Sequence, residues 1–225
     1  MIDSITVNHH IQKYILDILM HRQFARFRDM RPQSTDTNLY SYHLKNLQKQ
    51  HLVKKTSDGY TLDAKGLAYV DRLNAKTKRI SAQPKVITMV IIQDGYGNIL
   101  MYKKLRQPFI DTWTVPFGKV HDSDESIAHA AQREVHEKVG SFEVELRHAG
   151  DCYIRVKSDD VVVVSTLVHV FYGQSELPGV PHNFEWISPR ELISKATSPA
   201  IKDIVARTFF QDPYFFEEFE VRTSL

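Results

Sequence analysis

The segment from Gly118 to Gly140 constrains the fold of this chain more than any other. It reads GKVHDSDESIAHAAQREVHEKVG, a polar loop followed by a helical pattern that ends at a glycine. Residues three and four positions apart share one face of a helix, so Glu134, Glu137 and Lys138 converge there. An adjacent apolar stripe can pack on a sheet, and it comprises Ala128, Ala131, Val135 and Val139. The segment therefore predicts a helix with one charged and one buried face.

This segment resembles the box of the Nudix hydrolase family, in which spaced glycines frame a glutamate, an Arg-Glu pair and further glutamates. The matching positions are Gly118, Glu125, Arg133, Glu134, Val135, Glu137 and Gly140. Trp113 and Pro116 fit the family's usual approach to the box, and Phe184–Leu192, reading FEWISPREL, resembles a later segment. The resemblance covers about residues 86–210 and implies an α/β/α sandwich with a mixed sheet.

The same resemblance implies a chemistry. Nudix enzymes split a diphosphate linked to a nucleoside, and they use Mg²⁺ to neutralise phosphate oxygens and to activate water. Oxygen ligands suit this ion. The implied catalytic residues are Glu125, Arg133, Glu134 and Glu137, and the implied ligands of Mg²⁺ or Mn²⁺ are Glu134, Glu137 and the backbone carbonyl of Phe117. Gly118 and Lys138 are the expected contacts of a nucleotide ligand.

One departure from the family pattern lies on the helix, where Lys138 stands in place of a third carboxylate. Unit charges about 4 Å apart interact by roughly 4 kcal/mol at an effective dielectric constant near 20. Attraction to a divalent ion is therefore replaced by repulsion. Lys138 can swing outward on its flexible stem, pair with Glu134 or Glu137 where the metal would lie, or contact a ligand phosphate.

The other departure lies in the loop, where six residues rather than five separate Gly118 from Glu125. We assign the box glutamate to Glu125 rather than Asp124, because this choice keeps seven residues before Arg133 and a loop absorbs an insertion more easily than a helix. On this assignment we expect a structural pair between Glu125 and Arg133.

The family often adds a catalytic carboxylate from a later loop. The candidates are Asp151, Asp159, Asp160 and Glu176, and the sequence does not choose among them. Most of them are expected to be solvated loop charges.

Charge is divided unevenly along the 225 residues, although the whole chain carries a net charge of only +2. Residues 1–85 contain 15 Lys and Arg against seven Asp and no Glu, a net of +8, while residues 86–225 carry a net of −6. Only the first part is suited to a polyanion. We expect an α/β two-domain chain, with an N-terminal domain at 1–75, a linker at 76–85 and the Nudix domain at 86–225.

The N-terminal part predicts the order helix, helix, helix, hairpin, helix. Apolar spacing from Ile11 to Leu19 indicates the first helix, a short second helix is expected at Phe24–Met30, and the third covers about residues 36–50. Strands flank Ser57-Asp58-Gly59, and Asp63 can cap the last helix. From about residue 5 to residue 75 the chain resembles winged helix-turn-helix transcription factors, an α+β fold.

Winged helices of this type place the third helix in the major groove of double-stranded DNA. The resemblance implies that Asn38, Ser41, Tyr42 and Lys45 face the DNA, and that Lys54 and Lys55 position the wing. The alternative is a protein-interaction module that has the same fold without binding DNA. The pair His9-His10 is expected to be exposed to solvent.

Several classes of protein are excluded or disfavoured. The single Cys152 cannot form a disulfide within the chain, which fits a reducing cytoplasm. The apolar stretch Val161–Phe171 is too short for a membrane span, and the first twenty residues do not resemble a signal peptide. The aromatic run PYFFEEFE predicts a C-terminal helix packed on the Nudix core or against a second subunit, so a homodimer fits the sequence.

Three functions remain open. The first is a transcriptional regulator whose Nudix domain binds a nucleoside-diphosphate ligand, with hydrolysis weak or lost. Bacterial regulators of NAD metabolism that respond to ADP-ribose are similar, although their Nudix domain comes first. The second is an active Mg²⁺-dependent pyrophosphohydrolase with an accessory winged helix, and the third is a scaffold in which both domains bind protein.

Overall fold

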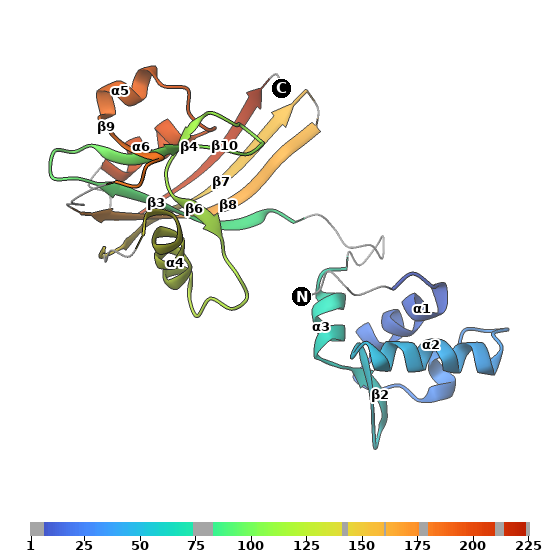
Figure 1. The fold of residues 1–225 in the computed structure, drawn as a ribbon. Coiled ribbons are helices and arrows are strands. Elements are labelled where there is room, and N and C mark those ends of the chain that lie inside the picture. Colours follow the sequence, from blue (N-terminus) through green and yellow to red (C-terminus); the bar gives the residue numbers. More distant parts are fainter. Residues whose placement is uncertain are drawn as a thin grey trace. The chain divides into compact units, whose positions relative to one another are not determined.

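The computed structural model describes residues 7–73, 83–140, 144–159, 161–175, 180–209 and 214–223. The chain divides into two compact units, Met1–Ala82 and Gln83–Leu225 (Figure 1). Most of the expected linker, residues 76–82, lies outside the described residues. Within the described ranges, no helix has the length and apolar character that crossing a membrane requires.

The N-terminal unit has the element order of a winged helix. Its elements are α1 (His10–Met20), the 3₁₀ helix η1 (Phe27–Met30), α2 (Thr37–Lys49), the hairpin strands β1 (Val53–Thr56) and β2 (Gly59–Leu62), and α3 (Ala64–Asp71). The expected second helix is thus a single 3₁₀ turn. The carboxylate of Asp36 caps α2 by accepting from the backbone N–H groups of Asn38 and Leu39, and Asp63 caps α3.

Two glycines allow the hairpin to pack closely on this unit. A Cβ atom at Gly66 would lie 2.0 Å from the carbonyl oxygen of Leu52, so only glycine lets α3 approach the start of the wing. Gly59 has a φ of +137° at the wing turn, and the neighbouring Tyr60 bridges to Ala25. The core beneath includes apolar residues of α1 and α2, among them Ile11, Ile15, Tyr40, Leu44 and Leu47.

The C-terminal unit is built on one mixed sheet. Its elements are β3 (Lys85–Gln93), β4 (Ile99–Lys103), β5 (Trp113–Thr114), β6 (Phe117–Lys119), α4 (Ile127–Val139), β7 (Arg147–Ser158), β8 (Val161–Gln174), β9 (Phe184–Ile187), α5 (Pro189–Ser194), α6 (Ile201–Phe209) and β10 (Phe215–Thr223). The strand order is β10-β7-β8-β3-β4-β5, with β6 paired to β3 and β9 paired to β4. The pairs β3–β8 and β10–β7 are parallel.

Helices cover both faces of this sheet, which gives an α/β/α sandwich (Figure 1). Alternate residues of β3 point to opposite sides, as the pleat requires. Met89 and Ile91 pack with α5 and α6, whereas Val90 and Ile92 pack with Ala131, Val135 and Val139 of α4. The expected apolar stripe of α4 is correct except at Ala128, which is exposed, while Ala130 is buried instead.

The C-terminal segment is a strand, so the prediction of a terminal helix is wrong. Side chains of β10 alternate between half-buried and exposed, a period of two, and Phe215 and Phe219 pack on the core. The strand pairs in parallel with β7 over its whole length. The free edge of β7 satisfies the backbone hydrogen bonds of this segment, and this pairing overrides the helical spacing of its aromatic residues.

Candidate functional site

The charged face of α4 is positioned by capping at both ends of the helix. The Oγ atom of Ser126 accepts from the backbone N–H of His129 at 3.0 Å, and the helix ends at Gly140, whose φ of +111° favours glycine. The loop before the helix folds back on itself, because the backbone N–H of His121 donates to Asp124 at 2.7 Å. This loop therefore places Asp124 beside the helix.

Arg133 fixes the loop to the helix. Its Nε and Nη2 atoms donate to the two oxygens of Asp124, each at 2.9 Å, and Nη2 also donates to the carbonyl of Lys119 at 2.9 Å. The side chain of Asp124 is only 2% exposed. The hydrogen bonds from Arg133 hold the pKa of Asp124 well below its usual range, and in turn Asp124 raises the pKa of Arg133.

The expected pair between Glu125 and Arg133 is therefore wrong. Asp124 occupies the position beside the guanidinium, and Glu125 is exposed. The family spacing of five residues after Gly118 therefore identifies the partner of Arg133 correctly, whereas the spacing of seven residues before Arg133 does not. The physical reason is that Ser126 caps the helix, so the residue next to the cap points to solvent while Asp124 turns inward.

Glu134 is buried between two cationic groups. Its side chain is 7% exposed, with Oε1 2.8 Å from Nη1 of Arg133 and Oε2 3.0 Å from Nζ of Lys138. Of the three arrangements open to Lys138, the structure shows the ion pair with Glu134. Both oxygens of this carboxylate thus already face a positive charge.

Strand β6 lies directly against this ion pair. A Cβ atom at Gly118 would lie 1.7 Å from the carboxyl carbon of Glu134, so glycine is required for the approach. The ring of Phe117 lies under Lys138, with Nζ 4.7 Å from the ring centroid. Phe117 and Gly118, the two residues of β6 that the sequence predicts at the site, are therefore both in contact with the charged face of α4.

This donor set does not fit a magnesium ion. Mg²⁺ requires a near-octahedral shell of oxygen ligands, but the oxygens of Glu134 lie close to Arg133 and Lys138. Glu137 is 56% exposed and lies 3.5 Å from Nη1 of Arg133. Among the described residues, no third carboxylate, histidine or cysteine joins these two glutamates in a metal-binding cluster.

A cavity of about 370 Å³ opens on the other side of β6, over the sheet face that packs with α5 and α6. Its basic lining residues are Lys85, Lys104, Arg106, Lys119 and Lys138, and no aspartate or glutamate is among the described residues that line it. Its apolar lining includes Ile87, Met89, Ile154, Val156 and Val164. The arrangement suits a ligand with an anionic part and an apolar part.

Lys104 is a site residue that the sequence did not indicate. It is half-buried, and burial together with the nearby charge of Lys85 lowers its pKa. Its Nζ atom donates to the carbonyl of Pro108 and lies 5.7 Å from the ring centroid of Phe117. Lys104 and Lys138 thus both approach Phe117. The only signal in the sequence is that Lys104 directly follows an apolar strand.

The two candidates for a later catalytic carboxylate that the structure describes, Asp151 and Asp159, do not line the cavity. Asp151 lies in β7, where it is hydrogen-bonded to His148 and His169, and Asp159 is exposed at the turn after β7. Neither is among the residues that line the cavity. Asp160 and Glu176 lie outside the described residues.

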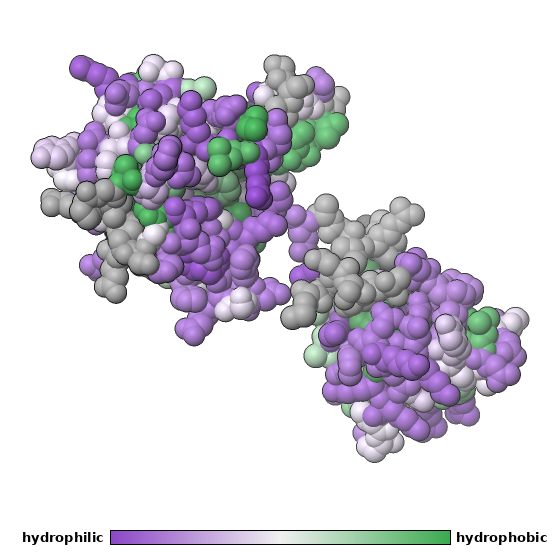
Figure 2. All heavy atoms as spheres, viewed as in Figure 1, coloured by the Kyte–Doolittle hydropathy of each residue, from purple (hydrophilic) through white to green (hydrophobic). Residues whose placement is uncertain are grey.

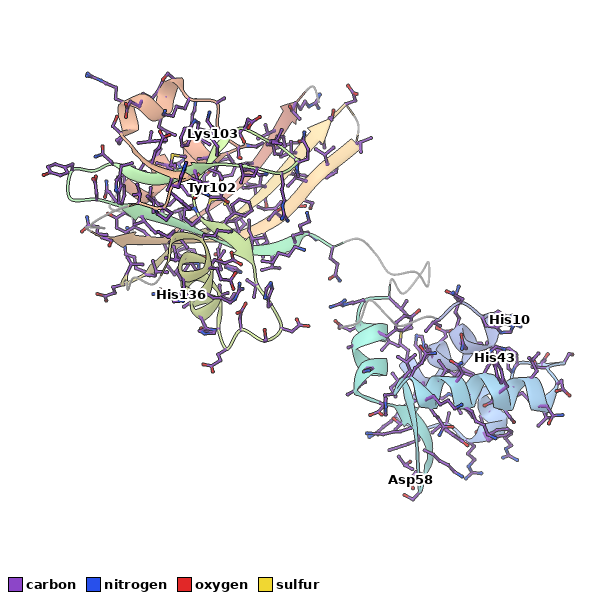
Figure 3. All side chains as sticks on the ribbon, viewed as in Figure 1. His10, His43, Asp58, Tyr102, Lys103 and His136 are labelled. Carbon is purple, nitrogen blue, oxygen red and sulfur yellow. The ribbon has the colours of Figure 1, made fainter. Side chains whose placement is uncertain are left out.

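The residues expected to face DNA share one face of α2. Asn38, Tyr42 and Lys45 are exposed and Ser41 is half-buried, whereas Tyr40, Leu44 and Leu47 form the buried face. On the wing, Lys54 and Lys55 are exposed, and Nζ of Lys54 lies 3.8 Å from Asp63. Asp58 is at the tip of the hairpin (Figure 3). Hydrophilic residues predominate on the side of this unit that Figure 2 shows.

Only one member of the pair His9-His10 is exposed as expected. His10 is exposed (Figure 3). His9, in contrast, is half-buried and stacks on His43 of α2, with ring centroids 3.8 Å apart. His9 also caps α1, because its Nδ1 atom accepts from the backbone N–H of Ile11. The capping role draws the ring of His9 toward the protein.

Comparisons with known proteins place the fold. The sequence profile of the NUDIX domain family matches residues 83–209, more than half of the chain. No curated protein matches the sequence. Among solved structures, the NUDIX domain of Shewanella oneidensis NrtR complexed with ADP ribose is 10% identical, with a TM-score of 0.50, and the match covers 63% of this chain and 94% of that one. The MutT protein from Bacillus halodurans is 19% identical, with a TM-score of 0.51 and coverage of 60% and 89%. At these identities the likeness shows the fold alone.

Proposed function

This chain belongs to the NUDIX domain family, and on that premise we propose that it is a DNA-binding transcriptional regulator. Its Nudix unit binds a nucleoside-diphosphate ligand such as ADP-ribose, and hydrolysis is weak or lost. The observation that carries this proposal is the ion pair between Lys138 and Glu134 beside a cavity with basic but no acidic lining residues. That site favours binding a diphosphate over activating water through a metal.

The charge of the cavity explains how the ligand is held. A diphosphate carries negative charge on several oxygens, and lysine or arginine side chains form charge-assisted hydrogen bonds with such groups. Lys104 and Lys138, which both approach Phe117, are the first contacts we assign to it. The apolar part of the cavity, which includes Met89 and Ile154, then receives the nucleoside.

The same geometry disfavours hydrolysis. A Nudix reaction needs a metal to neutralise the phosphate oxygens and to activate water. Glu134 is held by Arg133 and Lys138, and Glu137 alone cannot supply the remaining oxygen ligands. The ligand therefore remains intact long enough to act as a signal.

The N-terminal unit supplies the response. Its exposed face on α2, with Asn38, Tyr42 and Lys45, has the composition of a helix that enters the major groove. The net charge of +8 over residues 1–85 favours binding to phosphates. We place the protein in the cytoplasm and expect it to bind its DNA as a homodimer, in the manner of many winged helices.

The test is a DNA-binding assay on the full chain with genomic upstream fragments, with and without ADP-ribose and related nucleotides. ADP-ribose is the first ligand to try because a NUDIX domain of the same fold, that of NrtR, is complexed with it. Product is measured in the same tubes with Mg²⁺ or Mn²⁺. We expect a DNA shift that changes with ligand and little product.

The opposite result would identify the other candidate function. Rapid metal-dependent turnover without any DNA shift would make the protein a pyrophosphohydrolase and would overturn the regulator. A variant that combines Asn38→Ala with Lys45→Ala serves as the control for DNA binding, because both side chains are exposed on α2 and their loss leaves its buried face unchanged.

A further inference from the structure

A second cluster of polar side chains lies away from the cavity, on strands β7 and β8. Nε2 of His148 lies 2.8 Å from Oδ1 of Asp151, and Nδ1 of His169 lies 2.7 Å from the same oxygen. The three ligand atoms all lie within 4.8 Å of one another. Two imidazoles therefore converge on one carboxylate oxygen.

The sheet builds this convergence by a local irregularity. Asp151 and His169 are paired directly across β7 and β8. His148 precedes Asp151 by three residues, a spacing that puts two side chains on opposite faces of a regular strand. The register shift between His148 and Gly150 inserts one residue and returns His148 to the face of Asp151. Such bulges commonly re-aim a side chain beside a functional site.

Neighbouring groups hold the cluster in place. The ring of His148 stacks on Phe171, with centroids 4.9 Å apart and planes at 19°, and Phe171 is part of the core under α4. The hydroxyl of Tyr214, just before β10, donates to the other oxygen of Asp151. Strand β10 can lie this close because Gly150 has no side chain, since a Cβ atom there would lie 2.5 Å from Phe215.

The charge of the cluster differs from that of the Nudix helix. The carboxylate of Asp151 accepts hydrogen bonds from Tyr214, His148 and His169. In the described part of the chain, its hydrogen-bond partners are these three groups, and none is a lysine or arginine. Among the described residues, Asp151 thus differs from Glu134, whose carboxylate is paired with Arg133 and Lys138.

We propose that His148, Asp151 and His169 bind one divalent transition-metal ion of the zinc type. Two imidazoles and a carboxylate supply two nitrogen ligands and one oxygen ligand. This set suits ions of the zinc type better than it suits Mg²⁺. Metal–ligand bonds of about 2.0–2.2 Å in a tetrahedron hold ligand atoms roughly 3.4 Å apart. The two nitrogen–oxygen distances, now 2.8 and 2.7 Å, therefore lengthen by about 0.6–0.7 Å, and the two nitrogens, now within 4.8 Å of each other, settle at the same spacing. When the ion enters, a neutral imidazole moves the proton that points at Asp151 to its other ring nitrogen, whereas an imidazolium releases that proton to solvent.

The site is open enough for an ion to enter from solvent. The side chains of His148, Asp151 and His169 are 39%, 20% and 13% exposed. Three protein ligands leave one position of a tetrahedral ion for water or an external ligand. Tyr214 fixes the orientation of Asp151 in the manner of an outer-shell partner, so a bound ion would link β7, β8 and the start of β10.

The test uses the full-length protein, stripped of metal and titrated with Co²⁺ and Cu²⁺ as spectroscopic probes. We expect an intense visible Co²⁺ spectrum and a Cu²⁺ electron paramagnetic resonance spectrum with hyperfine lines from two imidazole nitrogens. Both signals should disappear in a variant that combines His148→Ala with His169→Ala. The matched control is His182→Ala, an exposed histidine elsewhere on the same unit, which should bind like the wild type. Excess Mg²⁺ should not displace either probe.

A wild-type Cu²⁺ spectrum without nitrogen hyperfine lines would overturn the proposal, as would unchanged binding in the double variant. Circular dichroism shows whether that variant is folded. If it is not, Asp151→Asn replaces it, and we expect Co²⁺ affinity to fall at least about tenfold. Full affinity in folded Asp151→Asn would also refute the site. These outcomes do not depend on the function proposed for the cavity.

Discussion

The ammonium nitrogen of Lys138 lies 3.0 Å from Oε2 of Glu134, one helical turn away on α4. The box that this helix resembles carries a carboxylate at the position of Lys138. A side chain that would attract a divalent ion is thus replaced by one that neutralises the neighbouring glutamate. The same ammonium also lines the cavity, so one substitution both removes a metal ligand and adds an anion ligand.

Restoring the carboxylate should restore metal binding. We expect Lys138→Glu to bind Mn²⁺ at least about tenfold more tightly than the wild type, because an interaction of roughly 4 kcal/mol at 4 Å changes sign. Latent hydrolysis of ADP-ribose should rise with it. Isothermal titration calorimetry measures the first effect, and release of AMP measures the second.

Lys138→Gln separates the two roles of this residue. It removes the positive charge without adding a metal ligand, so it should weaken ADP-ribose binding and leave Mn²⁺ affinity low. A wild type that already hydrolyses ADP-ribose rapidly, together with a Lys138→Glu variant that gains nothing, would show that our interpretation of Lys138 is wrong.

Lys104 should matter for the ligand although it lies outside the box. We expect Lys104→Ala to weaken ADP-ribose binding by about 10- to 100-fold, since a hydrogen bond to a charged group contributes about 1.5–3 kcal/mol. Lys103→Ala is the matched control, because Lys103 is adjacent on β4 but lies over Trp113 and does not line the cavity. Isothermal titration calorimetry at low salt compares the affinities of the two variants for ADP-ribose. Equal losses in the two variants would mean that general charge, rather than Lys104, attracts the ligand.

Asp124 should contribute to stability in a pH-dependent way. Arg133 holds its pKa well below the ordinary value of 3.8 in the folded protein. A carboxyl group with a depressed pKa stabilises the fold fully above its unfolded-state value, and the contribution is lost as the pH falls below 3.8. We expect Asp124→Asn to lower the unfolding temperature at neutral pH and to remove part of the acid sensitivity of the wild type.

Glu125→Gln is the control for this experiment. Glu125 is exposed and is not the partner of Arg133. The stability of the Glu125→Gln protein should therefore match that of the wild type across the same pH range. Thermal unfolding followed by circular dichroism, from neutral pH to below 3.8, distinguishes the two. A larger loss in Glu125→Gln than in Asp124→Asn would contradict the observed pairing.

The sequence predicts those parts of the fold that depend on local signals. The predicted N-cap Asp63 and the terminal Gly140 mark helix ends where the structure has them. Each of these residues acts on backbone groups only a few positions away in the chain. The turn residues Ser57-Asp58-Gly59 likewise place the hairpin of the wing.

What the sequence could not predict depends on contacts between distant segments. The choice between Asp124 and Glu125 is made by how the loop closes on Arg133, and the strand β10 exists because β7 offers a free edge. The aromatic residues before Thr223 are compatible with a helix or a strand until that edge is present. The basic cavity escaped prediction for the same reason, since its lysines come from several separate elements.

The face of α2 gives a last prediction, on DNA. If Lys45 contacts a phosphate, Lys45→Ala should weaken binding to all DNA sequences about equally. The negative slope of log affinity against log salt should also become shallower by about 0.9. Tyr42→Ala should instead reduce affinity mainly for the specific site, because base contacts carry the sequence information. Lys13→Ala on α1 is the matched control, since it removes one exposed lysine from another face of the same unit. Fluorescence anisotropy over a range of salt concentrations measures all three. A slope that changes equally in Lys45→Ala and Lys13→Ala would mean that α2 does not face the DNA.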